Sequence, residues 1–257
     1  MFEKFLSKEE TFLCFKMYFI PTLIQFVGGR VMHEIELVES YTAYLKEKGV
    51  EFWENGFPKF KSNWIITTKP SVIAPFNKRQ YYWQNKQDIS ICYFDKDEHL
   101  YPRLDKVFRE IEILKEYHSV CMMDISISPL MLDEVQRMNL LLNLLFICVV
   151  AVNGIKIIPS FRTGSFETLQ LLVQSVGHSD YWAMGAVGTQ QIKNDAFFDY
   201  LFKTKCMFIM PKHLLCYGRP NKQTKDCLEK YGIEYKPIYK DFRSLSYSSE
   251  NKLYVRL

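Results

Sequence analysis

The stretch SVCMMDIS, residues 119–126, starts with apolar residues and ends on the polar Asp124 and Ser126. Three later stretches have the same form, an apolar run that leads into small or polar residues: IKIIPSFRTG (155–164), YWAMGAVGT (181–189) and HLLCYGRP (213–220). Helix-like stretches separate the four. If all four are parallel strands, their carboxyl ends share one edge of a sheet, where α/β proteins bind ligands.

The alternation of strand-like and helix-like stretches continues on both sides of these four. ISICYF (89–94) precedes them, and IEYKPIY (233–239) follows them. Short connections between alternating strands and helices are typical of an α/β fold with a mainly parallel sheet. We expect either an open doubly wound sheet or an incomplete barrel, preceded by a mostly helical N-terminal region.

Three regions follow from this pattern. Residues 1–88 are expected to be helical or irregular, 89–240 to form the α/β core, and 241–257 to be a peripheral tail. In the first region, VMHEIELVESYTAYLKEK (31–48) has apolar residues at helical spacing, and Gly49 follows as a plausible helix end. WIITT (64–68) is rich in bulky and β-branched residues, which favour a strand.

Several helix boundaries can be predicted in the core. Ser128-Pro129 has the form of an N-cap followed by proline at the first helical position, and Gly154 ends that helix. Ser165 and Gly177 delimit the next one. An earlier amphipathic helix follows the acidic turn at 95–98, and its predicted buried face consists of Leu104, Val107, Phe108, Ile111 and Leu114.

Composition is that of a globular protein. Of the 257 residues, 48% are hydrophobic and 24% are charged, which excludes a mostly disordered chain, and the net charge of +4 is too small to indicate a nucleic-acid partner by itself. The seven cysteines form no CxxC pair, which favours a reduced cytoplasmic protein. The apolar run 140–152 is shorter than the roughly 20 residues of a bilayer span, so we expect a buried helix and no membrane partner.

The strand ends supply the candidate site. We expect Asp124 as a polar or general-base group and Arg162 as an anion clamp, because a strand-end carboxylate needs a partner and a guanidinium near a helix start can hold an anion. Alternatively, Asp124 caps its loop or pairs with Arg162, and Arg162 is a surface residue. The other residues expected to line this pocket are Ser126, Thr163, Thr189 and Tyr217.

More specific catalytic signatures are missing from the chain. GAVGT (185–189) is not a dinucleotide fingerprint, and no phosphate-binding GxxxxGK[ST], HExxH or GxSxG motif occurs. The acidic group Asp95, Asp97 and Glu98 lacks the spacing of a calcium loop and is expected to mark a helix start. We therefore predict no metal site, and the sequence leaves the cofactor open.

KRQYYWQNK (78–86) interleaves cations with aromatic rings, a combination that single-stranded nucleic-acid binding uses. The candidate contacts are Lys78, Arg79, Tyr81 and Trp83. The same segment could instead dock on a neighbouring part of the protein.

Residues 91–220 resemble the prokaryotic and phage family known as domain of unknown function 4417. The resemblance rests on SICYFDKDEHL, the Asp124-x-Ser126 motif, Gln136 and Asn139, the strand Gly154–Pro159 and the pair Tyr217-Gly218. The family has no established activity. Its setting in phages and mobile elements implies a role in replication or in phage–host conflict.

Two functions are compatible with these features. The first is an enzyme that acts on a nucleotide or nucleic acid at the strand-end edge. The second is a non-enzymatic binding protein, an inhibitor or accessory factor with a protein partner. A polar pocket in which Asp124 and Arg162 face each other would favour the enzyme, whereas a filled edge and an exposed aromatic patch would favour the binding protein.

Overall fold

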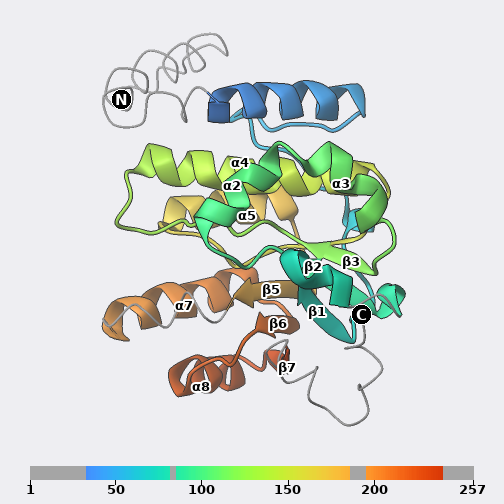
Figure 1. Cartoon of the computed structure of the whole chain (residues 1–257). Coiled ribbons are helices and arrows are strands. Elements are labelled where there is room, and N and C mark those ends of the chain that lie inside the picture. The colour runs from blue at the N-terminus through green and yellow to red at the C-terminus, as the bar shows by residue number, and fades with distance from the viewer. Residues whose placement is uncertain (1–32, 82–84, 186–194, 240–257) are drawn as a thin grey trace, which may run out of the picture.

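The computed structural model describes residues 33–81, 85–185 and 195–239. They contain seven strands and seven α-helices, and from β2 onward each pair of successive strands is joined by one or two helices (Figure 1). The strands are β1 Val72–Pro75, β2 Ile89–Cys92, β3 Ser119–Cys121, β4 Ile157–Ile158, β5 Tyr181–Gly185, β6 His213–Tyr217 and β7 Glu234–Tyr239. The helices are one at residues 33–47 and then α2 Asp97–Leu104, α3 Val107–Leu114, α4 Asp133–Val152, α5 Phe166–Val176, α7 Asp195–Ile209 and α8 Lys222–Lys230.

Every strand pairing is parallel, and the strands follow one another in chain order. One ladder joins β1 to β4 and a second joins β5 to β7. A parallel bridge between Ser160 and Ala183 links the two, and β7 lies against β1. A doubly wound sheet reverses its strand order at a switch point, and this order does not. The parallel α/β fold is confirmed, and of its two expected forms the structure is the incomplete barrel.

The barrel interior is filled by one small apolar cluster. Six neighbouring strands each contribute a side chain, and Ile66 adds one from the segment before β1. The six are Ile73, Cys92, Cys121, Ile158, Ala183 and Leu215. Alternate residues of these strands point outward and pack against the helices, so each strand is covered on both faces. The interior is therefore a packed core with no room for a channel through the strands.

Helix α4 packs against the barrel on one side and under the helix at 33–47 on the other (Figure 1). Tyr41 and Leu45 of that helix are buried in the same core, and the Tyr41 hydroxyl donates a hydrogen bond to the carbonyl of Leu104. By length and composition α4 could cross a membrane, but 78% of its apolar window is buried inside the protein. The expected buried helix at 140–152 is confirmed.

Most elements lie where the sequence places them, with three differences. Helix α4 begins at Asp133 instead of Pro129, because Ser128–Met131 form a turn in which the Ser128 hydroxyl accepts from the Leu130 N–H. The helix after residue 96 is divided into α2 and α3, and Phe108 is 42% exposed instead of buried.

The third difference concerns the start of the barrel. Trp64 ends a 3₁₀ turn and Ile65 forms only a single bridge, with Ile157, so the strand expected at 64–68 is wrong. The first strand is Val72–Pro75, before residue 89, where the core was expected to begin. Pro75 ends this edge strand. Proline has no backbone N–H, and at this position no hydrogen bond to a neighbouring strand is lost.

Three amides on one face of α4 hold the loop that follows β3. Asn143 accepts from the Ile125 N–H (3.0 Å) and donates to its carbonyl (3.2 Å). Asn139 donates to the Ser126 carbonyl (2.9 Å), and Gln136 accepts from the Ser165 N–H (2.7 Å). All three side chains are buried. They provide hydrogen-bond partners for loop backbone groups that no longer pair with a neighbouring strand. The loops after β3 and β4 are thereby fixed from behind.

Replacing Asn143 by Leu tests this support. The variant leaves the N–H and C=O of Ile125 unsatisfied in the core, at a cost of about 1–3 kcal/mol for each group. We expect urea denaturation to show a loss of more than ~2 kcal/mol in the free energy of unfolding. Gln170→Leu, at an exposed side chain of α5, is the control and should cost less than ~0.5 kcal/mol. Equal losses in the two variants would contradict the assignment.

Candidate active site at the strand ends

Asp124 and Arg162 form a two-pronged ion pair at the carboxyl ends of β3 and β4. Arg162 Nε lies 2.7 Å from Asp124 Oδ1, and Nη2 lies 2.5 Å from Oδ2. The Ser160 hydroxyl donates a weaker bond to the same carboxylate (3.4 Å). The Asp124 side chain is only 5% exposed and that of Arg162 22%. Burial by itself lowers the pKa of the guanidinium, but the charge and hydrogen bonds of Asp124 raise it above its usual value.

A second cation, Lys205 of α7, lies beside this pair. Its ammonium group donates to the carbonyl of Thr163 (2.9 Å) and forms no ion pair within the described residues. Burial and the neighbouring Arg162 lower the pKa of Lys205 to about 7, and the charge of Asp124 offsets only part of this. The Thr163 hydroxyl is buried and has no hydrogen-bond partner there. Two cations thus lie next to each other and to an unpaired hydroxyl; Asp124 pairs with Arg162 alone, and Asp97 is a further negative charge that acts on Arg162.

The backbone around this cluster is crowded. The Ser126 N–H donates to Asp97 (3.0 Å), which ties the loop after β3 to the start of α2. A Cβ atom at Gly164 would lie 2.2 Å from Oε1 of Gln136 and 3.0 Å from the backbone of Ser128, so only glycine fits there. The Ser165 side chain caps α5 by accepting from the Thr168 N–H. These contacts fix Thr163 and Arg162 relative to α4.

Aromatic rings close the carboxyl end of the barrel. Phe94, two residues beyond β2, stacks on Tyr217 at the end of β6, with ring centroids 6.0 Å apart. A Cβ atom at Gly185 of β5 would lie 3.3 Å from the Phe94 ring, so the absence of a side chain at this position makes space for the ring. Tyr217, an expected pocket residue, is half-buried and belongs to this aromatic lid of Phe94 and Tyr217.

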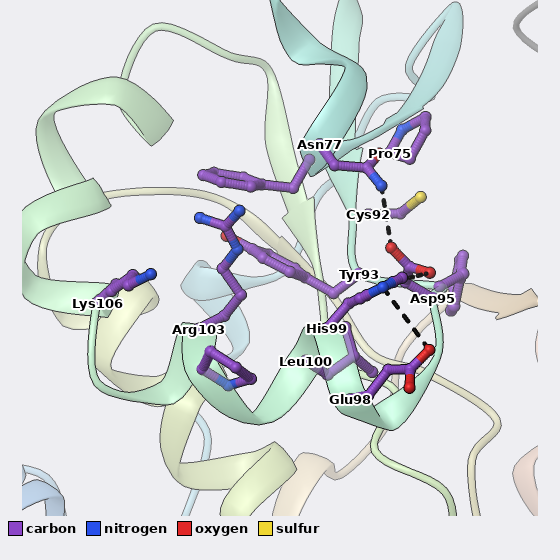
Figure 2. A pocket seen from close by; sticks show the side chains of 13 residues that line it. Pro75, Asn77, Cys92, Tyr93, Asp95, Glu98, His99, Leu100, Arg103 and Lys106 are labelled. Carbon is purple, nitrogen blue, oxygen red and sulfur yellow. Dashed lines mark hydrogen bonds and ion pairs between the residues drawn. The ribbon is translucent and has the colours of Figure 1, made fainter.

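A pocket of about 310 Å³ opens at the ends of β1 and β2 (Figure 2). Asp95 lies at one side of it, where it accepts from Asn77 Nδ2 (3.0 Å), from the Lys96 N–H (2.8 Å) and pairs with Nδ1 of His99 (3.0 Å). Arg103 and Lys106 line the opposite side in Figure 2. We refer to this space as the β1–β2 pocket.

The structure brings some of the expected site residues together and leaves others apart. Asp124, Arg162 and Thr163 are neighbours, whereas the backbone of Ser126 binds Asp97 and Asn139 instead. Of the two readings of Asp124 and Arg162, the ion pair is the one observed. Thr189 lies outside the described residues.

The segment 78–86 can be followed only in part. Arg79 donates to the carbonyl of Phe76 (2.9 Å) and covers its ring, so its guanidinium is directed at its own chain. Lys78 is half-buried. Tyr81 ends a 3₁₀ turn, its side chain is not described, and Trp83 lies outside the described residues. Nucleic-acid binding by this segment stays a prediction.

Sequence reasoning missed Lys205 and the residues of the β1–β2 pocket. Lys205 lies inside a helix, where a lysine is ordinarily solvated, and no spacing links it to Arg162. Asp95 and His99 are four residues apart across a helix start, which was the available signal for their contact. Within the described ranges, no group of three His, Cys, Asp or Glu side chains is arranged to hold a metal ion, and the six described cysteines are buried and form no disulfide.

Fold and site together define a parallel α/β barrel whose polar groups gather at the carboxyl ends of its strands, as in barrel enzymes. The family model described as "Domain of unknown function (DUF4417)" matches residues 48–236. The chain therefore belongs to this family, and the resemblance seen at residues 91–220 is confirmed over a longer span. No curated protein and no solved structure matches the chain.

The ion pair yields a stability prediction. Asp124→Asn removes the carboxylate that, among the described residues, forms the ion pair with Arg162 and leaves the guanidinium partly buried without this counter-charge, which costs about 3–5 kcal/mol for a buried pair. The double variant Asp124→Leu/Arg162→Met removes both charges and should recover much of this loss. Chemical denaturation of the wild type, of both variants and of the matching single variants Asp124→Leu and Arg162→Met measures the effect. A double variant that is as unstable as the sum of both single variants would contradict the coupling.

Proposed function

We propose that the protein is an enzyme that binds a nucleotide by its phosphate group at the carboxyl ends of β3 and β4. The observation that carries the proposal is the neighbouring pair of cations, Arg162 and Lys205, of which only Arg162 forms an ion pair, with Asp124, within the described residues. A phosphate would supply the missing negative charge, and phosphates are commonly bound by such paired cations. Asp124 acts as a positioning residue, because both of its oxygens are committed to Arg162.

Further features support a phosphate at this place. Nη1 of Arg162 has no hydrogen bond within the described residues, and Lys205 uses one of its three donors. The buried Thr163 hydroxyl can donate to a ligand oxygen. Tyr217 of the aromatic lid lies at the same end of the barrel and offers a ring on which a base can stack. The site thus combines anion-binding groups with an aromatic surface.

Nucleotide binding by two variants tests the proposal. Lys205→Met keeps the length of the side chain and removes its charge, which should weaken binding of adenosine monophosphate about 10- to 100-fold, the value of one charge-assisted hydrogen bond. Lys222→Met, at an exposed position on α8, is the control and should bind as the wild type does. Adenosine, which lacks the phosphate, should not bind measurably. Calorimetric titration gives the three affinities, and equal loss in both variants would contradict the proposal.

Proton uptake provides a second readout of the same titration. A bound phosphate raises the pKa of Lys205 from about 7, so binding near pH 7.5 takes up part of a proton. Affinity is then greatest below the pKa of the free protein and declines as the pH rises through the pKa of the complex. The binding enthalpy should be measured in two buffers of different ionisation enthalpy. The two values should differ for the wild type and agree for Lys205→Met. The same difference in both proteins would assign the proton to another group.

The pH dependence of folding tests Lys205 without any ligand. The pKa of this lysine is about 7 in the folded protein and near 10.5 in the unfolded chain, so between these values only the unfolded chain holds the proton. The contribution of Lys205 to the free energy of unfolding therefore rises from about pH 7 to about pH 10 and is constant below pH 7. Relative to the wild type, Lys205→Met should be most stable below pH 7 and lose that advantage as the pH rises. A difference that does not change with pH would contradict the lowered pKa.

A second candidate function has one observation in its favour. Phe166 and Phe208 contact each other edge to face, with 5.3 Å between ring centroids, and remain 45% and 41% exposed. Met207 and Met210, close to Phe208 in the sequence, are more exposed still. Such a surface suits a non-enzymatic binding protein in replication or phage–host conflict. If a protein partner captured from the host is lost in Phe208→Glu while adenosine monophosphate fails to bind the wild type, this candidate replaces the enzyme.

A further inference from the structure

We propose that the β1–β2 pocket is a separate acid–base site, which binds the phosphate group of a small molecule with Arg103 and Lys106 and exchanges a proton with it through His99. Neither residue of the Arg162–Lys205 pair lines this pocket, so the inference does not depend on the nucleotide site. Three observations carry it: the fixed orientation of His99, the cations that share its helical face, and an unpaired hydroxyl in the wall.

The orientation of His99 is set by a chain of hydrogen bonds. Asn77 and the Lys96 N–H hold the Asp95 carboxylate, and Asp95 contacts Nδ1 of the imidazole at 3.0 Å. A carboxylate accepts a hydrogen bond only from a protonated nitrogen, so the neutral ring carries its proton on Nδ1. Nε2 is then the free base, as in catalytic Asp–His pairs. Its nearest charged neighbour is Glu98, at 3.8 Å, too far for a hydrogen bond.

The anion-binding side of the pocket lies farther along the same face. His99, Arg103 and Lys106 are spaced by four and three residues, which aligns them on one side of α2 and the turn that follows. Arg103 donates to Glu110 through Nη1 (2.7 Å) and its guanidinium lies 4.7 Å from the centre of the Phe76 ring, so it is held in place with donors to spare. Lys106 is exposed and forms no ion pair within the described residues.

The wall between the two sides contains an unsatisfied donor. The Tyr93 ring is 2% exposed, stacks on Phe76, and in Figure 2 extends from β2 toward the Arg103 guanidinium. Its hydroxyl has no hydrogen-bond partner within the described residues. Burial, with Glu110 nearby, raises the pKa of Tyr93, which keeps the hydroxyl protonated as a donor. Oε2 of Glu110 is also buried without a hydrogen-bond partner within the described residues, but it does not accept from Tyr93, so the hydroxyl remains a donor for a phosphate oxygen.

The proton transfer follows from this arrangement. A water or ligand hydroxyl next to the bound phosphate gives its proton to Nε2 of His99, and its oxygen keeps the electron pair of the broken O–H bond. The imidazolium that forms is stabilised by Asp95, which retains its hydrogen bond to Nδ1. The proton returns to the same oxygen in the reverse transfer, so the step is a reversible proton exchange. Asp95 and Asn77 are positioning residues, and His99 is the group that exchanges the proton.

Acylation of His99 by diethyl pyrocarbonate, followed by mass spectrometry, tests the site with inorganic phosphate as the probe. The reagent attacks the neutral Nε2, and phosphate bound at Arg103 and Lys106 should slow the reaction by the factor 1 + [L]/Kd, about tenfold at 10 mM for a Kd near 1 mM. Chloride keeps the ionic strength constant. His178, exposed and far along the chain, is the internal control and should react at an unchanged rate.

Two variants make the outcome decisive. Lys106→Met, at an exposed position that the fold does not need, should lose most of the phosphate protection, whereas Lys205→Met should keep it. In nitrogen NMR spectra the neutral His99 ring should carry its proton on Nδ1 in the wild type and on Nε2 in Asp95→Ala. The proposal is overturned if phosphate protects His99 no more than His178, if Lys106→Met keeps full protection, or if the wild-type ring is protonated on Nε2. If phosphate no longer protects His99 in Lys205→Met, the β1–β2 pocket and the Arg162–Lys205 site are one site, and the claim of a separate site is wrong.

Discussion

The buried ion pair between Asp124 and Arg162 is the contact on which the candidate site depends. It joins the ends of two adjacent strands by two hydrogen bonds of 2.7 and 2.5 Å, and neither charge could remain at its place without the other. Burial, and next the charge of Arg162, which this pair holds in place, lower the pKa of Lys205 to about 7. A packed, one-layer barrel interior leaves the strand ends as the place where such charges can gather.

The buried amides of α4 perform the structural part of this arrangement. Gln136, Asn139 and Asn143 lie on one face of α4 and bind the backbone of the loops after β3 and β4. A helix of leucines alone would pack as well against the barrel, but it would leave those loops without partners. The buried amides of α4 thus fix the loops of the site from the core side, while the aromatic lid and the two cations lie at the strand ends.

The sequence predicts the fold better than the site. Alternating strands and helices identify the parallel α/β class, because strand and helix periodicity are local properties, and the ends of α5 follow from Ser165 and Gly177. Barrel closure depends on which distant strands pair, which local patterns do not contain. Asp124 and Arg162 could be expected to meet because both follow strands. Lys205 and the Asp95–His99 contact could not, because each owes its character to burial or to a neighbour that is set by the tertiary structure.

A crystal structure of the protein with adenosine monophosphate tests the central claim most directly. We expect the phosphate to lie within hydrogen-bond distance of Lys205 Nζ and Arg162 Nη1, with the Asp124–Arg162 pair intact. A phosphate bound elsewhere, with Lys205 still donating only to the Thr163 carbonyl, would contradict the assignment of this edge as the nucleotide site.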